Sequence, residues 1–282
     1  MTFGDTVQFT LFTNDPALAA RADRAGVDRI GLDLERIGKA QRQPGRKSWV
    51  SDHRLEQLHS VGEAVKHGRL FVRTNPMHEG LPEEVSRCLT MGARVLMLPM
   101  FTTVAEAARF VELVDGRAEV SLLVETPAAG IRIRELVKLE GVSEIHVGLN
   151  DMSLGLGLAS HFEVLVSDFL TNIARVVVDA GLPFGFGGVG RLGDSSLPIP
   201  PDLVYAQYPR LRATRALISR VFVTPDQARL DLQDEVRITR QRLTFWARQP
   251  EDELQRATVA LMTAVSSLIV AQEKAGGQRS RA

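Results

Sequence analysis

Short apolar runs alternate with segments of helical periodicity along most of this chain. The runs lack the strict polar–apolar alternation of a half-exposed strand, which predicts parallel strands buried on both faces. We expect eight strands, at residues 7–12, 29–35, 70–75, 94–99, 120–125, 144–151, 183–189 and 213–219. Helices are expected between them, at 16–25, 52–66, 82–91, 104–114, 131–139 and 162–180.

Eight strands joined by helix-length connections predict an α/β fold of the (β/α)8 TIM-barrel type, because the eighth strand can close the sheet. An open, doubly wound sheet is the alternative. No Gly-x-Gly-x-x-Gly follows the first strand, however, so a dinucleotide-binding fold has little support. We expect a barrel domain at 1–224, C-terminal helices over 225–275 that break near Pro250, and a disordered tail at 276–282. The last helix either caps the barrel or packs on another subunit.

The formal net charge is zero, so electrostatics favour neither nucleic acid nor an anionic membrane as a partner. The N-terminus lacks the basic region and long apolar core of a signal peptide. The apolar stretch 257–271 is interrupted by Thr and Ser and is too short to span a bilayer. We therefore expect a cytoplasmic protein. Its single cysteine, Cys88, falls in an expected helix, where a thiol usually packs as a small hydrophobe.

Two expected strands end in a carboxylate, Glu125 and Asp151, and a helix-length segment separates them. Adjacent parallel strands would bring both carboxylates to the same edge of the sheet. Two hard oxygen ligands close to helix N-termini suit a divalent metal, with Mg²⁺ or Mn²⁺ as the first choices. Taken singly, each residue could instead cap the helix that follows it.

The other strand ends add polar groups to the same edge, where the chemistry of such barrels lies. These groups are Asp33, Glu35, Arg36, Arg73, Asn75, Asn150, Ser219 and Arg220. Arg73 could serve a substrate or simply pair with Glu35 or Glu125. The glycine-rich run 185–193 is either a tight turn or a set of backbone N–H groups that favour a carboxylate or phosphate.

No lysine falls within an expected strand. The five lysines of the chain are Lys39, Lys47, Lys66, Lys138 and Lys274. A Schiff-base aldolase or a pyridoxal phosphate enzyme normally needs a lysine that projects from the core. Metal-assisted chemistry is therefore the favoured interpretation.

The runs GVDRIGLDLE, LFVRTNP, GARVLMLPMFTTVAEA, LLVETPAAG and HVGLNDMSLGLG occur in this order. With them the chain resembles the HpcH/HpaI aldolase and citrate lyase β-subunit family, within the phosphoenolpyruvate/pyruvate barrel superfamily, from about residue 7 to 222. The run RIGKAQRQPGRKSWVSDH is also similar to a branch found among surface-polysaccharide genes. The resemblance implies a (β/α)8 barrel, often with C-terminal helices exchanged between subunits of a homo-oligomer. Phosphotransfer from phosphoenolpyruvate is not indicated, because no room remains for a swivelling phosphohistidine domain.

The resemblance also implies a site. Family members bind a divalent metal through one Glu and one Asp, which match Glu125 and Asp151. Pyruvate, or the pyruvate-like part of the substrate, chelates the metal, and its carboxylate meets backbone N–H groups of the loop that holds Gly148, Asn150 and Asp151. An arginine that matches Arg73 stabilises the enolate oxygen, so that metal and guanidinium together offset the charge left when a C–C bond breaks.

The chain departs from the family pattern near this site. Aldolases of the family carry Asp-x-Glu-His after the second strand and use the histidine for proton transfer, whereas this chain has Arg36 there. Glu35 and His53 are the candidates for proton transfer instead, and His78 is an alternative. His53 could equally lie at the surface or cap the helix that follows it. Two further family residues, a glutamine before the metal glutamate and a basic residue after the proline of the fourth strand, are replaced by Leu123 and Met100.

The leading expectation is a metal-dependent, class II-type aldolase, which cleaves or forms a C–C bond to a pyruvate enolate and takes a 2-oxo acid and an aldehyde. The first alternative is a citrate-lyase-like enzyme that acts on an acyl-CoA such as malyl- or citramalyl-CoA, with Arg191 and Arg220 for the CoA phosphates. The second is a non-catalytic barrel that binds a metabolite, which the missing histidine motivates.

Overall fold

A computed structural model describes residues 1–39, 51–223 and 230–279. Its eight parallel strands form a closed barrel in sequence order, and β8 pairs with β1. The strands are β1 (Gln8–Phe12), β2 (Arg29–Asp33), β3 (Arg69–Arg73), β4 (Val95–Leu98), β5 (Glu119–Val124), β6 (Val142–Val147), β7 (Phe184–Val189) and β8 (Arg215–Ile218). The predicted (β/α)8 barrel is confirmed, and its closure excludes the open sheet.

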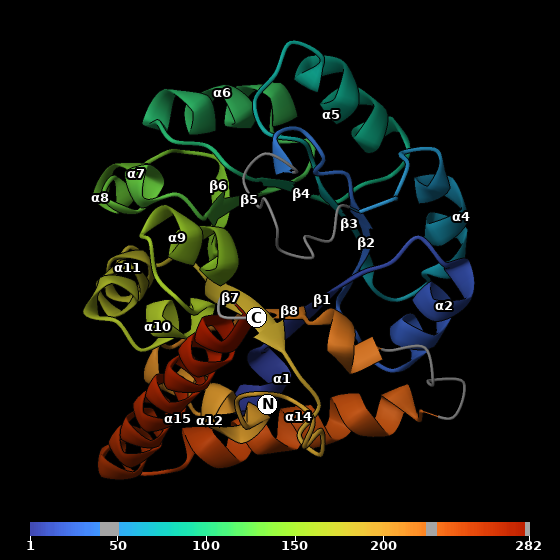
Figure 1. The fold of residues 1–282 in the computed structure, drawn as a ribbon. Coiled ribbons are helices and arrows are strands. Elements are labelled where there is room, and N and C mark those ends of the chain that lie inside the picture. The colour runs from blue at the N-terminus through green and yellow to red at the C-terminus, as the bar shows by residue number, and fades with distance from the viewer. Residues whose placement is uncertain (40–50, 224–229, 280–282) are drawn as a thin grey trace.

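Helices surround the barrel (Figure 1). They are α1 (Phe3–Thr6), α2 (Pro16–Arg24), α4 (Gln57–Ala64), α5 (Leu81–Thr90), α6 (Val104–Val114), α7 (Pro127–Gly130), α8 (Ile133–Leu136), α9 (Leu149–Gly155), α10 (His161–Leu165), α11 (Asp168–Asp179), α12 (Pro201–Tyr205) and α13 (Gln207–Arg210). The single helix expected at 162–180 is two helices, α10 and α11. The hydroxyl of Ser167 accepts the N–H of Leu170 at 3.1 Å and thereby caps a new helix.

The sixth strand ends earlier than expected. β6 stops before Gly148, and α9 begins directly after it, so Asn150 and Asp151 lie in the first turn of a helix and not in a strand. The N–H of Met152 donates to the carbonyl of Gly148 at 3.1 Å, which is a helical bond. An acidic residue is favourable in a first helical turn, because the helix dipole is positive there. The expected strand 144–151 is therefore wrong in its last four residues.

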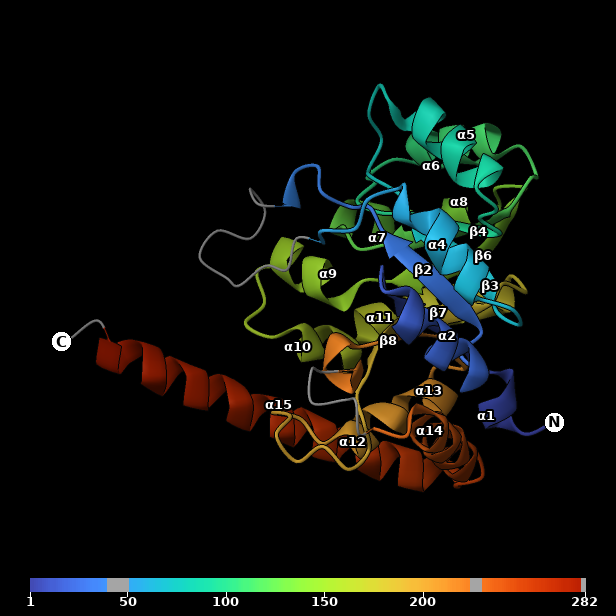
Figure 2. The same ribbon diagram turned by 90° about the vertical axis from the view of Figure 1, so that its right-hand side faces the viewer.

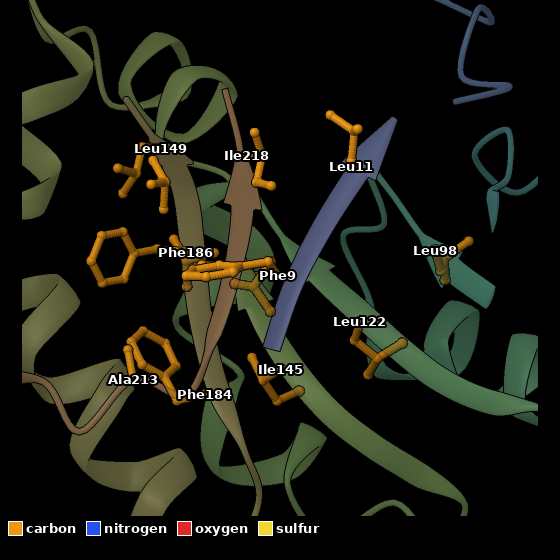
Figure 3. Close-up of a cluster of buried hydrophobic side chains, with 14 of the residues drawn as sticks. Phe9, Leu11, Leu98, Leu122, Ile145, Leu149, Phe184, Phe186, Ala213 and Ile218 are labelled. Carbon is orange, nitrogen blue, oxygen red and sulfur yellow. The ribbon is translucent and has the colours of Figure 1, made fainter. Parts of the chain in front are cut away.

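The main core lies between the barrel and the helices. Phe9, Ile145, Phe184 and Phe186 are at most 1 % exposed, and Figure 3 shows them together on the outer side of the strands. Tyr208 stacks on Phe186 with ring centroids 4.2 Å apart. Burial of each such aromatic side chain contributes roughly 1.5–3 kcal/mol. Cys88 is buried in α5, as predicted, and burial raises the pKa of its thiol to about 12.

The barrel interior has an apolar layer and a charged layer. The apolar layer consists of Phe71, Val95, Met97 and Leu123, each at most 1 % exposed, with Phe12 packed on it. This layer separates the two ends of the barrel interior.

The charged layer closes the barrel at the amino ends of the strands. Arg29 Nη1 lies 2.7 Å from Glu144 Oε1, and Arg215 Nε lies 2.6 Å from Glu144 Oε2. Glu119 pairs with Arg29 at 3.1 Å and also with Arg69. We call these five residues the charge plug. Burial raises the pKa of Glu144, but the two arginines outweigh it and hold that pKa at about 2. Access to the interior is thus left to the carboxyl ends of the strands.

The C-terminal region forms two helices, α14 (Leu232–Ala247) and α15 (Glu251–Arg279). They are separated near Pro250, as expected. Arg242 of α14 binds Asp202 of α12 through two hydrogen bonds, of 2.5 and 2.6 Å, and so holds α14 to the barrel domain. The second half of α15 extends away from the barrel (Figure 2). Along α15 the side chains of Val259, Met262 and Val270 are 47–52 % exposed.

Helix α15 differs from the expected tail in two respects. It continues to Arg279, whereas disorder is expected from residue 276. Its segment Glu251–Lys274 contains an 18-residue window with a mean hydropathy of 1.5, and it is long and apolar enough to cross a membrane by length and composition. The expectation that this stretch is too short to span a bilayer is therefore wrong. A single such helix is weak evidence for a span. Lys47, the expected domain boundary at 224–225 and residues 280–282 lie outside the described residues.

Candidate active site

Arg73, the last residue of β3, is held by a carboxylate of the neighbouring strand. The register of β2 and β3 places Asp33 opposite Arg73. Arg73 Nε donates to Asp33 Oδ1 at 2.8 Å and Nη2 to Oδ2 at 2.7 Å, a bidentate pair. Nη2 also lies 3.3 Å from Glu35 Oε2, and the guanidinium stands 5.3 Å from the ring centroid of Phe12. Within the described part of the chain, Nη1 has no hydrogen-bond partner, so it can serve a ligand.

The charges of this pair stabilise each other against burial. Burial raises the pKa of Asp33, but the Arg73 guanidinium and the Lys39 ammonium outweigh it and hold that pKa well below its usual range. Burial likewise lowers the pKa of Arg73, and Asp33 and Glu35 outweigh it and raise that pKa. Both side chains are therefore charged at neutral pH.

Lys39 reaches the site from the loop after β2. No described lysine lies in a strand, as predicted, yet the side chain of Lys39 is only 7 % exposed and its Nζ lies 3.0 Å from Glu35 Oε2 and 3.7 Å from Asp33 Oδ2. Reasoning from strands alone missed this residue. The spacing of four residues between Glu35 and Lys39 was the available signal, because such pairs commonly form ion pairs. An ion-paired ammonium is a poor nucleophile, so the contact does not indicate a Schiff base.

Glu125 follows β5 and is 2 % exposed. Its Oε1 accepts the backbone N–H of Met100 at 3.1 Å. Met100 adopts a left-handed conformation with φ 56°, which is unfavourable for a residue other than glycine and recurs at functional sites. The other oxygen, Oε2, packs on Gly148, where a β-carbon would lie 2.5 Å away. The carboxylate is therefore fixed on both sides by backbone.

Three carboxylates meet at Glu125. Burial and the negative charges of Glu35 and Asp151 raise the pKa of Glu125 well above its usual range, and Arg73 opposes them. A cation bound among such carboxylates relieves their repulsion. Mg²⁺ commonly binds through one or two carboxylates, with water and substrate oxygens as its other ligands, so Glu125 and Asp151 fit such an ion. No three His, Cys, Asp or Glu side chains of the described residues are arranged to hold a metal by themselves.

Asp151 and Asn150 reach this end of the barrel from the first turn of α9. Asn150 is exposed and Asp151 is half-buried. The N–H groups of this turn precede the first helical bond, which Met152 donates to Gly148. Such groups, at the positive end of a helix dipole, favour an anionic oxygen.

His53 lies beside Asp33, and Arg36 holds the segment that carries it. The backbone N–H of Asp33 donates to Nδ1 of His53 at 3.0 Å. Arg36 donates from Nε to the carbonyl of Ser51 at 3.1 Å and from Nη2 to that of His53 at 2.9 Å. Arg36, which occupies the position where the resemblance predicts a histidine, thus fixes the backbone of another histidine, His53.

The hydrogen bond to Nδ1 also sets the protonation of His53. Burial lowers the pKa of the ring, which favours neutral imidazole at neutral pH. Since Nδ1 accepts a hydrogen bond, we assign the proton to Nε2, where it can be donated. The neutral ring can therefore donate a hydrogen bond from Nε2.

His78 belongs to a different contact group. Its Nε2 lies 3.6 Å from Glu84 Oε2, and its Nδ1 accepts the N–H of Gly80 at 3.1 Å. Asn75 joins Glu84 to the loop after β2, because its own N–H and Nδ2 donate to the Glu84 carboxylate at 2.8 Å each while Oδ1 accepts from Arg36 at 2.9 Å. Asn75 therefore has a structural role.

The glycine-rich run is mostly strand. β7 covers Phe184–Val189, so the tight turn and the loop of free N–H groups are both wrong for these residues. At Gly185 a β-carbon would lie 2.6 Å from His146 Nδ1, so glycine is needed for packing inside the barrel.

The two arginines expected to bind CoA phosphates have different charged neighbours. Arg191 lies 3.5 Å from Asp194, whereas burial lowers the pKa of Arg220, whose charged neighbours are Asp33 and Arg73.

Comparison with known proteins agrees with this description. The profile of the family HpcH/HpaI aldolase/citrate lyase matches residues 8–186. No curated protein matches the chain significantly in sequence.

Solved structures show the same fold at low sequence identity. An HpcH/HpaI aldolase/citrate lyase family protein from Burkholderia cenocepacia J2315 is 17 % identical with a TM-score of 0.62, over 81 % of this chain and 94 % of that one. A citrate lyase from Burkholderia xenovorans LB400 is 18 % identical with a TM-score of 0.61, over 95 % and 86 % of the two chains. The citrate synthase SbnG is 16 % identical with a TM-score of 0.58, over 84 % and 94 %.

Proposed function

The chain belongs to the HpcH/HpaI aldolase/citrate lyase family, and on this premise we propose that it is a metal-dependent lyase that cleaves or forms a C–C bond to the enolate of pyruvate or a related 2-oxo acid. The observation that carries the proposal is the position of Arg73. Asp33 fixes its guanidinium, Nη1 has no partner among the described side chains, and the crowded carboxylate of Glu125 is a charged neighbour.

Glu125 and Asp151 would hold the divalent ion, Mg²⁺ or Mn²⁺. When bound, such an ion supplies a Lewis acid that polarises a carbonyl oxygen. The backbone N–H groups from Leu149 to Asp151 would bind the carboxylate of the 2-oxo acid. The N–H of Gly148, expected to take part, instead donates to the carbonyl of Val124 at 3.1 Å. Arg73 Nη1 would donate to the oxygen on which enolate charge develops, and one such donor is typically worth about 3–4 kcal/mol.

Glu35 and His53 are assigned to the handling of the proton, Glu35 as the group that transfers it and His53 as a hydrogen-bond donor. Glu35 is fully buried and contacts both Arg73 and Lys39, so two cations orient its carboxylate. We propose that Glu35 accepts, in cleavage, the proton of the hydroxyl group on the carbon that becomes the aldehyde, and returns it to the aldehyde oxygen in bond formation. His53 would donate a hydrogen bond from Nε2 to the same oxygen. Contacts of both groups with the surroundings of Asp33 support this assignment. The N–H of Asp33 donates to His53 Nδ1 at 3.0 Å, and Lys39 Nζ lies 3.0 Å from Glu35 Oε2 and 3.7 Å from Asp33 Oδ2.

Exchange of the methyl protons of pyruvate with D₂O, followed by NMR, tests the proposal. It requires only an enolate and no second substrate. We expect exchange in the presence of Mg²⁺ or Mn²⁺ and its loss after treatment with EDTA. If neither ion supports exchange while both bind, the chain is instead a non-catalytic barrel that binds a metabolite.

A free aldehyde is preferred to an acyl-CoA as the second substrate. The citrate-lyase-like alternative needs a basic pocket for CoA phosphates, but Arg191 is engaged by Asp194 at 3.5 Å. Saturable binding of CoA would restore that alternative. The link to a surface-polysaccharide branch stays a prediction. It rests on the run at residues 36–53, and residues 40–50 of that run lie outside the described part of the chain.

We also propose that the chain forms a homo-oligomer in the cytoplasm through α15, which carries the exposed side chains of Val259, Met262 and Val270. Light scattering on the full chain should give a mass above that of one chain, and removal of residues 262–282 should lower it. A monomer that floats with lipid vesicles would contradict the proposal and favour a membrane role for the helix.

A further inference from the structure

A small apolar pocket lies beside the candidate site, at the carboxyl ends of β7 and β8. Its volume is about 240 Å³. Its walls are largely aliphatic, with Leu149, Leu197, Ile199, Val204 and Val221 among them. His161 and Ser219 are the polar side chains of the lining. The hydroxyl of Ser219 already donates to the carbonyl of Val189 at 2.7 Å, and the ring of His161 packs on Phe162 with centroids 4.1 Å apart.

Two residues that line the pocket are direct neighbours, along the chain, of residues at the candidate site. Leu149 directly follows Gly148, and Ser219 directly precedes Arg220. Figure 3 shows Leu149 and Ile218 at the end of the barrel toward which the strands point. In (β/α)8 enzymes the loops after the seventh and eighth strands frequently bind the phosphate of a substrate. In this chain the same position is apolar.

Glycines at the end of β7 form part of the pocket. Gly187, Gly188 and Gly190 all line it. A β-carbon on Gly190 would lie 2.7 Å from a methyl carbon of Leu197, so glycine lets the loop close over the pocket. This packing gives a role to the glycine-rich run that neither an anion site nor a tight turn explains.

We propose that this pocket binds the aliphatic or aryl substituent of the second substrate and so selects an uncharged, apolar aldehyde. The inference rests on the proposed function. A charged substituent would lose its hydration in the pocket and find few partners, because Ser219 is engaged. The volume lies below the ≈ 300–1,000 Å³ of typical ligand pockets, which suits a substituent and not a CoA arm.

A series of aldehydes tests the assignment. With pyruvate and Mn²⁺, kcat/KM should rise about fourfold for each methylene group from acetaldehyde to butanal, the gain expected for its burial. Succinic semialdehyde, of similar length but anionic, should react no faster than acetaldehyde. Val221→Asp places a charge at the pocket and should lower the butanal-to-acetaldehyde ratio about tenfold. Val221 is 38 % exposed, so this variant should fold.

Ile131→Asp is the matched control, because Ile131 is 71 % exposed and does not line the pocket. This variant should keep the wild-type ratio. If pyruvate proton exchange occurs but butanal is not preferred, or if Val221→Asp keeps the preference, the pocket assignment is overturned and the proposed function stands. If the wild-type protein shows no exchange with either ion, the proposed function and this inference fall together.

Discussion

A β-carbon on Gly148 would lie 2.5 Å from Oε2 and 2.7 Å from Cβ of Glu125. The residue that follows β5 can therefore pack against the junction of β6 and α9 only because Gly148 has no side chain. Met100 holds the other carboxylate oxygen through its N–H at 3.1 Å. The position of the carboxylate thus depends on backbone at both oxygens.

Gly148→Ala should displace this carboxylate and weaken the binding of Mn²⁺ by about tenfold or more, because side-chain groups that orient metal ligands are typically worth 10–100-fold in affinity. Isothermal titration with Mn²⁺ measures the change. Gly193→Ala is the control, since no atom lies within 4 Å of the β-carbon it would add. Equal affinities for the two variants would show that Gly148 does not position a ligand.

Glu125→Gln and Asp151→Asn should each remove most Mn²⁺ affinity and stop pyruvate proton exchange, because a neutral amide is a weaker ligand than a carboxylate. Electron paramagnetic resonance of free Mn²⁺ measures the affinity. Glu112→Gln serves as the control, because Glu112 is 65 % exposed and pairs only with Arg109 among its described contacts. Full exchange in either site variant would contradict the assigned ligands.

Arg73→Lys should lower the rate of pyruvate exchange about 10²- to 10³-fold, the usual loss when one donor to a developing oxyanion is removed. Lysine keeps the charge but cannot form the bidentate pair with Asp33 or present a third nitrogen. Exchange rates at saturating Mn²⁺ measure the effect. Arg109→Lys, at an exposed ion pair, should have the wild-type rate; a rate near wild type for Arg73→Lys would exclude its assigned role.

Lys39→Met should lower the free energy of unfolding by about 1–3 kcal/mol, because it leaves the buried Glu35 carboxylate with one cation fewer. Urea denaturation at pH 7 measures the difference. Lys66→Met is the control, since Lys66 is exposed and makes no described ion pair. No loss of stability would mean that solvent already screens the contact.

The stability of the protein should rise with pH between about 4 and 6.5. Burial lowers the pKa of His146 to about 4, against about 6.5 in an unfolded chain. Between these values the unfolded state binds a proton that the folded state does not, so acid removes up to roughly 3 kcal/mol of stability. His146→Gln should flatten urea-denaturation midpoints over this range, whereas His59→Gln, at a side chain 76 % exposed, should not. Parallel pH curves for wild type and His146→Gln would refute the assignment.

The barrel could be predicted from the sequence because buried parallel strands and helices have different periodicities, and all eight strands were identifiable. The end of the sixth strand was not, because the run HVGLND is apolar enough to extend a strand, while the bond from Met152 to Gly148 that begins α9 depends on three-dimensional geometry. Periodicity also could not reveal the break at Ser167, where a cap overrides a continuous apolar pattern.

The structure brings Asp33, Glu35 and Arg73, at the ends of neighbouring strands, into direct contact. Asp151 acts electrostatically on Glu125, although it lies in the first turn of α9 and not at the end of a strand. Lys39 escaped prediction because a long side chain can reach a site from a loop. The local φ of Met100 and the clearance at Gly148 were equally hidden, since both depend on how β4, β5 and β6 meet.

The charge plug and the candidate site occupy opposite ends of the same barrel, with Phe71, Met97 and Leu123 between them. Substitutions at sites so separated usually have independent effects on stability. A residue at the carboxyl ends of the strands, such as Arg36, can therefore be substituted during evolution without compensating substitutions in the charge plug. In the plug, Arg29 and Arg215 share Glu144, so a change there leaves a buried charge uncompensated unless a second change accompanies it. Among descendants of this chain, we expect plug residues to be replaced in concert and residues around the mouth one at a time.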